Sequence, residues 1–162
     1  MKFRSKAGHP NDTYILLEKL KSTHGKFKTT IRSLKILLLA DMFESQYTIC
    51  HEIIGKKPGF CICVTGGIHG DEDTGAEAAL AASEYAAKEL VEGSLISIPW
   101  ANPGAIRRRT RDSIYEAYDG ESDLNRAFTK ESDGSRLQQH ANAILSCINN
   151  YNRKKRTVIM LI

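Results

Sequence analysis

An apolar run at residues 60–66 leads through two glycines into a long alanine-rich segment at residues 73–91. The first segment has the length and composition of a buried strand, and the second has the length and composition of a helix. Thr74 and Glu77 have the spacing of a capping box, which predicts that the helix starts at or just after Glu72. A strand joined so closely to a helix constrains the chain to an arrangement in which helices pack on a sheet.

The rest of the chain repeats this alternation. We expect further strands at residues 35–40, 47–54, 95–99 and 157–162, and further helices at residues 11–20 and 137–150. Two glycines and a proline within residues 55–59 predict a turn that joins the neighbouring strands as an antiparallel hairpin. Asn102-Pro103-Gly104 predicts another turn, and the polar residues 107–130 predict a long loop. The expected fold is a single α/β domain, residues 1–162, with a mixed β-sheet flanked by helices.

Composition excludes several classes of protein. The net charge of +4 comes without a basic stripe or aromatic platforms, which argues against a nucleic-acid-binding protein. The longest clean apolar run, residues 36–40, is far too short to span a membrane, and the first ten residues do not resemble a signal peptide. The four cysteines show no paired metal-binding spacing, which favours a reduced, cytoplasmic protein.

His69 and Glu72 follow the strand at residues 60–66, three positions apart across a glycine. In open α/β sheets the ligand crevice lies beyond the carboxyl ends of the strands. An imidazole and a carboxylate at this spacing can both reach one Zn²⁺ ion. The alternative is a surface loop in which both side chains only face water.

A second group of polar residues follows the strand at residues 95–99. Arg111 comes nine residues after Asn102, and Asp123, Asn125 and Arg126 follow. A guanidinium group matches a carboxylate bidentately, so the arginines suit an anionic substrate. A metal-bound histidine needs a carboxylate behind it to fix its tautomer, and this segment also offers one.

Taken together, three motifs resemble the zinc carboxypeptidase superfamily, most closely the N-terminal part of its succinylglutamate desuccinylase/aspartoacylase branch. They are His-Gly-Asp-Glu at 69–72, Asn-Pro-x-Ala at 102–105 with Arg111, and Asp-Leu-Asn-Arg-x-Phe at 123–128. The resemblance implies that His69 and Glu72 are zinc ligands and that Asp123 supports the ligand histidine. It implies that Arg111 polarises the scissile carbonyl and that Asn125 and Arg126 hold a substrate carboxylate.

The implied reaction is hydrolysis of an amide bond in a small N-acyl amino acid or peptide that bears a carboxylate. The family's third zinc ligand and its general-base glutamate would fall beyond Ile162, so we expect a C-terminally truncated domain that is inactive alone. His140 lies at the margin of a helical apolar face, which favours a structural role over that of a substitute ligand. Two alternatives stay open: a metallocarboxypeptidase-like peptidase, because the stretch between Arg111 and Asp123 is long, and a non-catalytic remnant or binding module.

Overall fold

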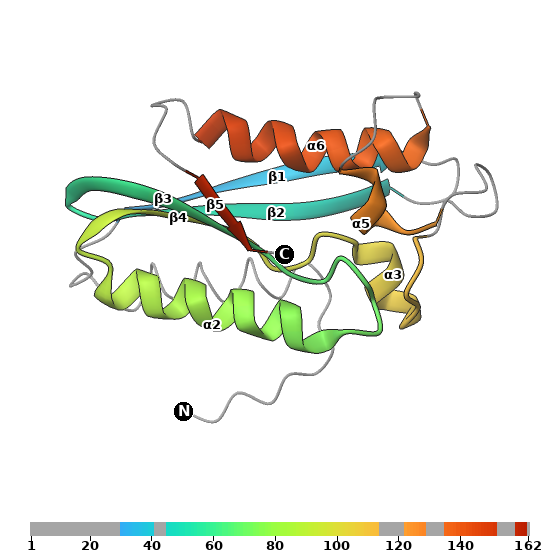
Figure 1. The fold of residues 1–162 in the computed structure, drawn as a ribbon, viewed down its shortest axis with the longest axis horizontal. Helices are drawn as coiled ribbons and strands as arrows, with labels where there is room; N and C mark the ends of the chain where they lie inside the picture. The colour runs from blue at the N-terminus through green and yellow to red at the C-terminus, as the bar shows by residue number, and fades with distance from the viewer. Residues whose placement is uncertain (1–29, 41–44, 114–121, 129–134, 152–157, 162) are drawn as a thin grey trace.

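A computed structural model describes residues 30–40, 45–113, 122–128, 135–151 and 158–161 (Figure 1). The strands are β1 (Thr30–Ala40), β2 (Ser45–Ile54), β3 (Lys57–Thr65), β4 (Glu92–Ile98) and β5 (Val158–Leu161). The helices are α2 (Asp73–Glu89), α3 (Pro103–Arg108), α5 (Leu124–Ala127) and α6 (Arg136–Tyr151). The helix expected at residues 11–20 lies outside the described residues.

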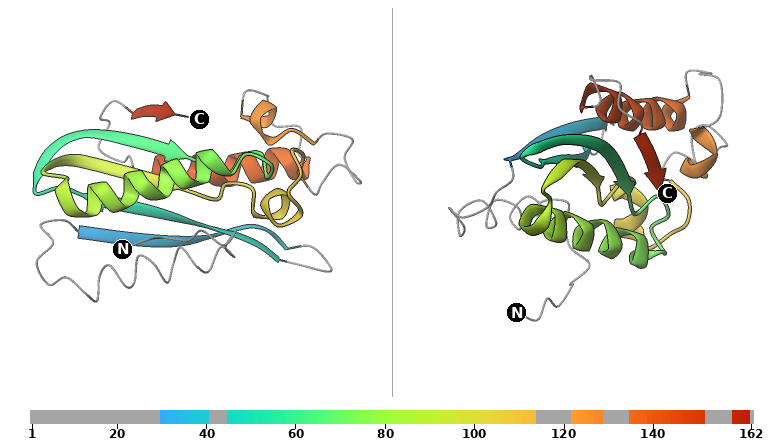
Figure 2. Two further views of the ribbon diagram at one scale, coloured as in Figure 1. Left: turned by 90° about the horizontal axis from the view of Figure 1, so that it is seen from below. Right: turned by 60° about the vertical axis from the view of Figure 1, so that its left-hand side comes forward.

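The five strands form one mixed sheet in the order β1-β2-β4-β3-β5. The β1–β2 and β2–β4 pairs are antiparallel, whereas β3 runs parallel to both β4 and β5. Helices α2 and α6 lie on opposite faces of this sheet (Figure 2). The predicted α/β class with a mixed, helix-flanked sheet is confirmed.

The predicted hairpin between β2 and β3 is wrong, because β4 lies between these two strands. The turn between them instead passes the start of β4, where the Gly55 N–H donates to Gly93 and the Lys57 N–H donates to Val91. A β carbon at Gly55 would lie 2.8 Å from the Val91 backbone. Glycine at position 55 therefore allows two backbones to approach each other closely. The antiparallel pair of consecutive strands is β1–β2 instead.

The predicted start of α2 is correct, but the predicted capping box is not the reason. The helix begins at Asp73 with Glu72 as its N-cap residue, and no side chain caps it by a hydrogen bond. Thr74 therefore lies inside the first turn. The Glu72 carboxylate contacts His69 and Arg111 instead of the helix end.

Two short helices replace irregular structure that the sequence led us to expect. The predicted turn at Asn102 is the start of α3, where the Asn102 side chain accepts from the Ala105 N–H and Pro103 occupies the first turn. Both are standard helix-start signals. Within the predicted loop at residues 107–130, α5 begins after Asp123, whose side chain accepts from the Asn125 N–H.

Two apolar clusters hold the layers together, one on each face of the sheet. The larger lies under α6 and joins residues of β2, β3 and β4 to Leu137, Ala141 and Ile144 of that helix. The smaller packs Ala86 of α2 against Ile53 and Leu95. All four cysteines are buried and unpaired by disulfides, as expected for Cys61 and Cys63 in a strand. No helix among the described residues is long and apolar enough to cross a membrane.

Candidate active site

The candidate site lies where β3 ends and the chain turns back into α2. This turn can form only with glycines at two of its positions. A β carbon at Gly66 would lie 2.3 Å from the carbonyl oxygen of Gly75 in α2, and one at Gly70 would lie 2.0 Å from the backbone of Ala105. The turn is thus pressed between α2 and α3, which places His69 at the carboxyl end of β3.

The segment after β4 holds this turn by a series of backbone contacts. The Ala101 and Asn102 N–H groups donate to Gly66 and Gly67 at 2.9 Å each, and the Asn102 Nδ2 donates to the Ile68 carbonyl at 3.2 Å. The Gly70 N–H donates to Thr110 at 2.8 Å. His69 is therefore held by hydrogen bonds on both sides of it in sequence, and the residue is 7% exposed.

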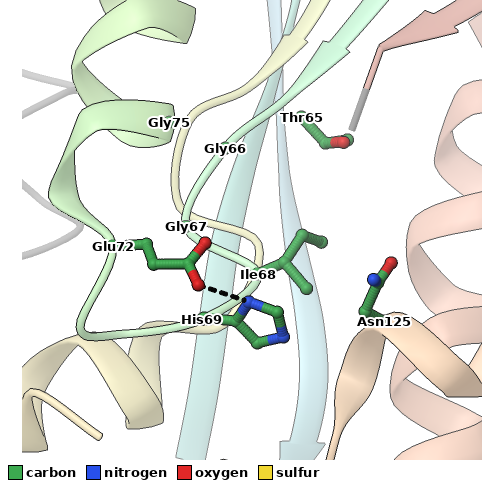
Figure 3. Close-up of a pocket in the computed structure, with 8 residues that line it drawn as sticks. All are labelled: Thr65, Gly66, Gly67, Ile68, His69, Glu72, Gly75 and Asn125. Carbon is green, nitrogen blue, oxygen red and sulfur yellow. Dashed lines mark ion pairs between the residues drawn. The ribbon is translucent and has the colours of Figure 1, made fainter. Parts of the chain in front are cut away.

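The His69 ring lies between two carboxylates. Its Nδ1 is 3.2 Å from Oε1 of Glu72, the contact drawn in Figure 3. Its Nε2 is 3.0 Å from Oδ1 of Asp123, which belongs to a segment 54 residues away in sequence. The structure therefore brings together the three residues that the sequence assigned to a metal site and its support.

This arrangement fits a zinc ion. Two ligand atoms that are each about 2.0–2.2 Å from a tetrahedral ion lie about 3.3–3.6 Å apart. The His69 and Glu72 atoms, 3.2 Å apart, come close to that spacing. Asp123 then occupies the place of the carboxylate that usually accepts the other ring proton of a ligand histidine. Within the described part of the chain, no group of three or more His, Cys, Asp or Glu side chains is arranged to hold a metal ion.

Both carboxylates have lowered pKa values. The hydrogen bond with His69 lowers the pKa of Glu72 most, and Arg111 adds a second hydrogen bond and its charge. Partial burial raises the pKa of Asp123, but hydrogen bonds from His69 and the Asn125 N–H outweigh that effect. Both groups are therefore ionised at neutral pH, which is the state that a metal ligand and its supporting acceptor require.

The two arginines each contact one of these carboxylates. Arg111 donates from Nη1 to Oε1 of Glu72 at 2.9 Å, and Nε of Arg126 lies 3.5 Å from Oδ2 of Asp123. Glu72 and Asp123 therefore compensate the charges of the two arginines. Both side chains are more than half exposed.

A pocket of about 170 Å³ opens beside His69. Its wall includes His69, Glu72 and Asn125, and backbone of the glycine-rich turn and of Gly75 (Figure 3). Among the described residues that line it, neither Arg111 nor Arg126 appears. Thr65 and Gly75 also line it, and neither was among the predicted site residues. Their places in the sequence could have indicated both residues. Thr65 is the last residue of β3, and Gly75 follows Glu72 by three positions.

His140 is a buried residue of α6. Its ring is 1% exposed, and its Nε2 lies 2.7 Å from the carbonyl oxygen of Ala101. Since a carbonyl only accepts, this nitrogen carries the proton. Burial lowers the pKa of His140 to about 4, although the bond to Ala101 partly opposes the shift. Its donor nitrogen is thus engaged with the backbone. The sequence favoured such a structural role over that of a substitute metal ligand.

Comparison with known proteins agrees with these motifs. The family model of the succinylglutamate desuccinylase/aspartoacylase catalytic domain matches residues 58–156. The chain belongs to this family. Its members are hydrolases, and the matched range contains every residue of the candidate site. No curated protein matches the chain.

Solved structures of the family have the same fold. The chain is 27% identical to an aspartoacylase family protein from Mesorhizobium loti, with a TM-score of 0.62, covering 85% of this chain and 41% of that one. It is 26% identical to a succinylglutamate desuccinylase/aspartoacylase from Rhodobacter sphaeroides, with a TM-score of 0.57, covering 78% of this chain and 38% of that one. The chain thus spans about two fifths of the length of these relatives.

A more distant likeness extends to the carboxypeptidase fold. Bovine thrombin-activatable fibrinolysis inhibitor, solved with tick carboxypeptidase inhibitor, has a TM-score of 0.58 at 16% identity. The match covers 94% of this chain and 59% of that one. At this identity the likeness concerns the fold alone, and it agrees with the predicted zinc carboxypeptidase-like sheet.

Proposed function

We propose that this chain carries the metal-binding half of a zinc-dependent hydrolase site. The supporting observation is the position of the His69 ring between Glu72, 3.2 Å from Nδ1, and Asp123, 3.0 Å from Nε2. Nδ1 of His69 and the Glu72 carboxylate would hold the ion, while Asp123 fixes the proton on Nε2 and the orientation of the ring. Bound zinc supplies a water of lowered pKa and polarises a carbonyl oxygen.

The substrate class in this proposal is a small N-acyl amino acid or peptide that bears a carboxylate, cleaved at an amide bond. Asn125 lies in the pocket wall beside His69, and Arg126 is one residue away on α5. An amide and a guanidinium group together can hold a carboxylate through several hydrogen bonds. Arg111 lies beside Glu72, from where it would stabilise the negative charge that develops on the attacked carbonyl.

The proposal includes three further expectations. We expect residues 1–162 to form one domain. We also expect a reduced, cytoplasmic setting, which the four free cysteines support. A catalytic zinc ion normally has three protein ligands, and in our proposal this sequence supplies two. The chain alone is therefore expected to bind zinc weakly and to hydrolyse amides at no useful rate.

Zinc binding tests the site directly. We expect calorimetric titration to give weak binding that His69→Ala and Glu72→Gln abolish. Asp71→Asn is the matched control, because Asp71 is the adjacent exposed carboxylate and lies outside the pocket wall. Equal affinities in the wild type and in Glu72→Gln would contradict the assignment of the ligands.

Substrate binding and turnover distinguish the alternatives. We expect N-succinylglutamate to bind, with Arg126→Ala and Arg111→Ala weakening the affinity at least tenfold, while the exposed Arg108→Ala leaves it unchanged. Tighter binding of a short peptide with a free C-terminus would favour the peptidase alternative, which the long stretch between Arg111 and Asp123 suggests. Tight, stoichiometric zinc with chelator-sensitive turnover would show that the chain supplies a complete site.

A further inference from the structure

Helix α6 bonds to two chain segments next to the candidate site, through two buried polar side chains near its N-terminus. Nε2 of Gln138 donates to the carbonyl of Ala127 at 3.0 Å, and His140 donates to the carbonyl of Ala101 at 2.7 Å. The two side chains are 3% and 1% exposed. A buried polar group is costly unless it is hydrogen-bonded, and an apolar residue of similar size would fill the same space. Unlike apolar packing, a hydrogen bond also fixes the relative orientation of the two groups that it joins.

The Gln138 contact holds the segment that carries Asp123. Ala127 is the last residue of α5, and Asp123 is the N-cap residue of the same short helix. A helix of 4 residues has little stability of its own, so its position depends on what it packs against. Leu124 and Ala127 are buried in the apolar cluster under α6. Gln138 adds a directional bond that fixes how far α5 lies along this surface.

The His140 contact holds the segment after β4, which in turn bonds to the turn that carries His69. Ala101 accepts from His140, and its own N–H donates to Gly66. The next residue, Asn102, donates twice into the same turn, to Gly67 and Ile68. His140 therefore reaches the His69 turn through one intervening segment.

We propose that Gln138 and His140 are positioning residues, which set the distance between the His69 ring and the Asp123 carboxylate. Gln138 holds the Asp123 segment to α6, and His140 holds to α6 the segment after β4 that supports the His69 turn. The inference rests on the proposed function for its use in metal binding. The contact it controls, 3.0 Å between Nε2 and Oδ1, joins two segments far apart in sequence. A shift of either segment relative to α6 would lengthen that contact and remove one of the two carboxylates that orient the ring.

The test uses the 162-residue chain with His140→Leu and Gln138→Met, which keep apolar bulk and remove the donors. The first measurement is made without zinc: nuclear magnetic resonance of the His69 Nε2 proton, whose slow exchange with water reports the bond to Asp123. We expect both variants to lose this slow exchange. His140→Gln, whose amide can still donate to Ala101, should restore it.

The second measurement is the zinc dissociation constant, which we expect to rise about tenfold in His140→Leu and in Gln138→Met and to stay within about threefold in His140→Gln. Ile144→Val is the control for a purely structural loss, because Ile144 is a buried apolar residue of the same helix. It should lower thermal stability and leave the His69 signal and the zinc affinity unchanged.

The outcomes separate the inference from the proposed function. A folded His140→Leu with the His69 signal and zinc affinity of the wild type would overturn the positioning role. If His140→Leu does not fold, Gln138→Met decides by the same two measurements. If the wild type binds no zinc, the proposed function fails, while the metal-free measurement on His69 still decides the positioning role.

Discussion

At the scale of single residues, Gly70 and Gly75 near the His69–Glu72 motif differ in the space around them. A β carbon at Gly70 would lie 2.0 Å from the backbone of Ala105, which cannot move without displacing α3. A β carbon at Gly75 would meet nothing closer than the Gly67 nitrogen at 3.7 Å, an ordinary contact. The first glycine is required by packing, whereas the second leaves room in the pocket wall.

We therefore expect Gly70→Ala to lower the free energy of unfolding by about 1–3 kcal/mol through overpacking. Gly75→Ala should raise it by about 0.5–1 kcal/mol, because alanine is the better helix former within α2. Urea unfolding of the two variants beside the wild type measures both effects. Similar losses in both would show that the approach of α3 to the His69 turn is looser than these distances indicate.

At the scale of elements, α3 depends on one asparagine. Asn102 accepts from the Ala105 N–H at 3.3 Å, which caps the helix, and donates to Ile68 at 3.2 Å, which ties the helix to the His69 turn. The side chain is 1% exposed, so neither partner regains a bond to water when it is removed. The same residue thus starts an element and attaches it to the site.

We expect Asn102→Ala to cost about 1–3 kcal/mol of stability, since it removes a helix cap and leaves a buried carbonyl unsatisfied. The measurement is the urea midpoint, together with the zinc affinity, which should also fall. Asn149→Ala, at an exposed position near the end of α6, is the control and should change stability by less than about 0.5 kcal/mol. If the control loses as much stability as Asn102→Ala, the cap makes no special contribution to stability.

At the scale of the whole molecule, the buried His140 makes stability depend on pH. Its folded-state pKa of about 4 lies below the ordinary value of 6.5, mainly because burial disfavours the charged ring. Between these two values the unfolded chain binds the proton and the folded chain does not, so stability falls as the pH is lowered through this window. The contribution is fully present above about pH 6.5.

We expect this group alone to remove on the order of 3 kcal/mol between pH 7 and pH 4. Other groups titrate in the same range, so the relevant quantity is the difference between the wild type and His140→Gln, which cannot take up the proton. Urea unfolding at pH 7, 5.5 and 4 measures it. A difference that does not change with pH would mean that His140 gains a proton while the protein stays folded.

The sequence by itself determined the elements and the local chemistry. Apolar patterns located the strands and the two long helices of the described residues, because a buried strand and an amphipathic helix are local patterns. The predicted ends lie within about three residues of the observed ones, except that β1 begins at Thr30 and was predicted to begin at residue 35. The spacing of His69 and Glu72 across Gly70 is also local, and it predicted that the two side chains meet. The short helix α3 could have been predicted too, from asparagine before proline.

Only the tertiary structure decided which strands are neighbours and which distant residues meet. The glycines near residue 55 looked like a hairpin turn because a local pattern does not record that β4 inserts between β2 and β3. The contact of His69 with Asp123 was expected through resemblance, and its distance depends on how two segments 54 residues apart in sequence pack together. The pairing of each arginine with a carboxylate, and the pocket wall at Gly75, likewise depend on distances between segments that are far apart in the chain. Such distances arise from packing of the whole sheet and its helices, which no single stretch of sequence contains.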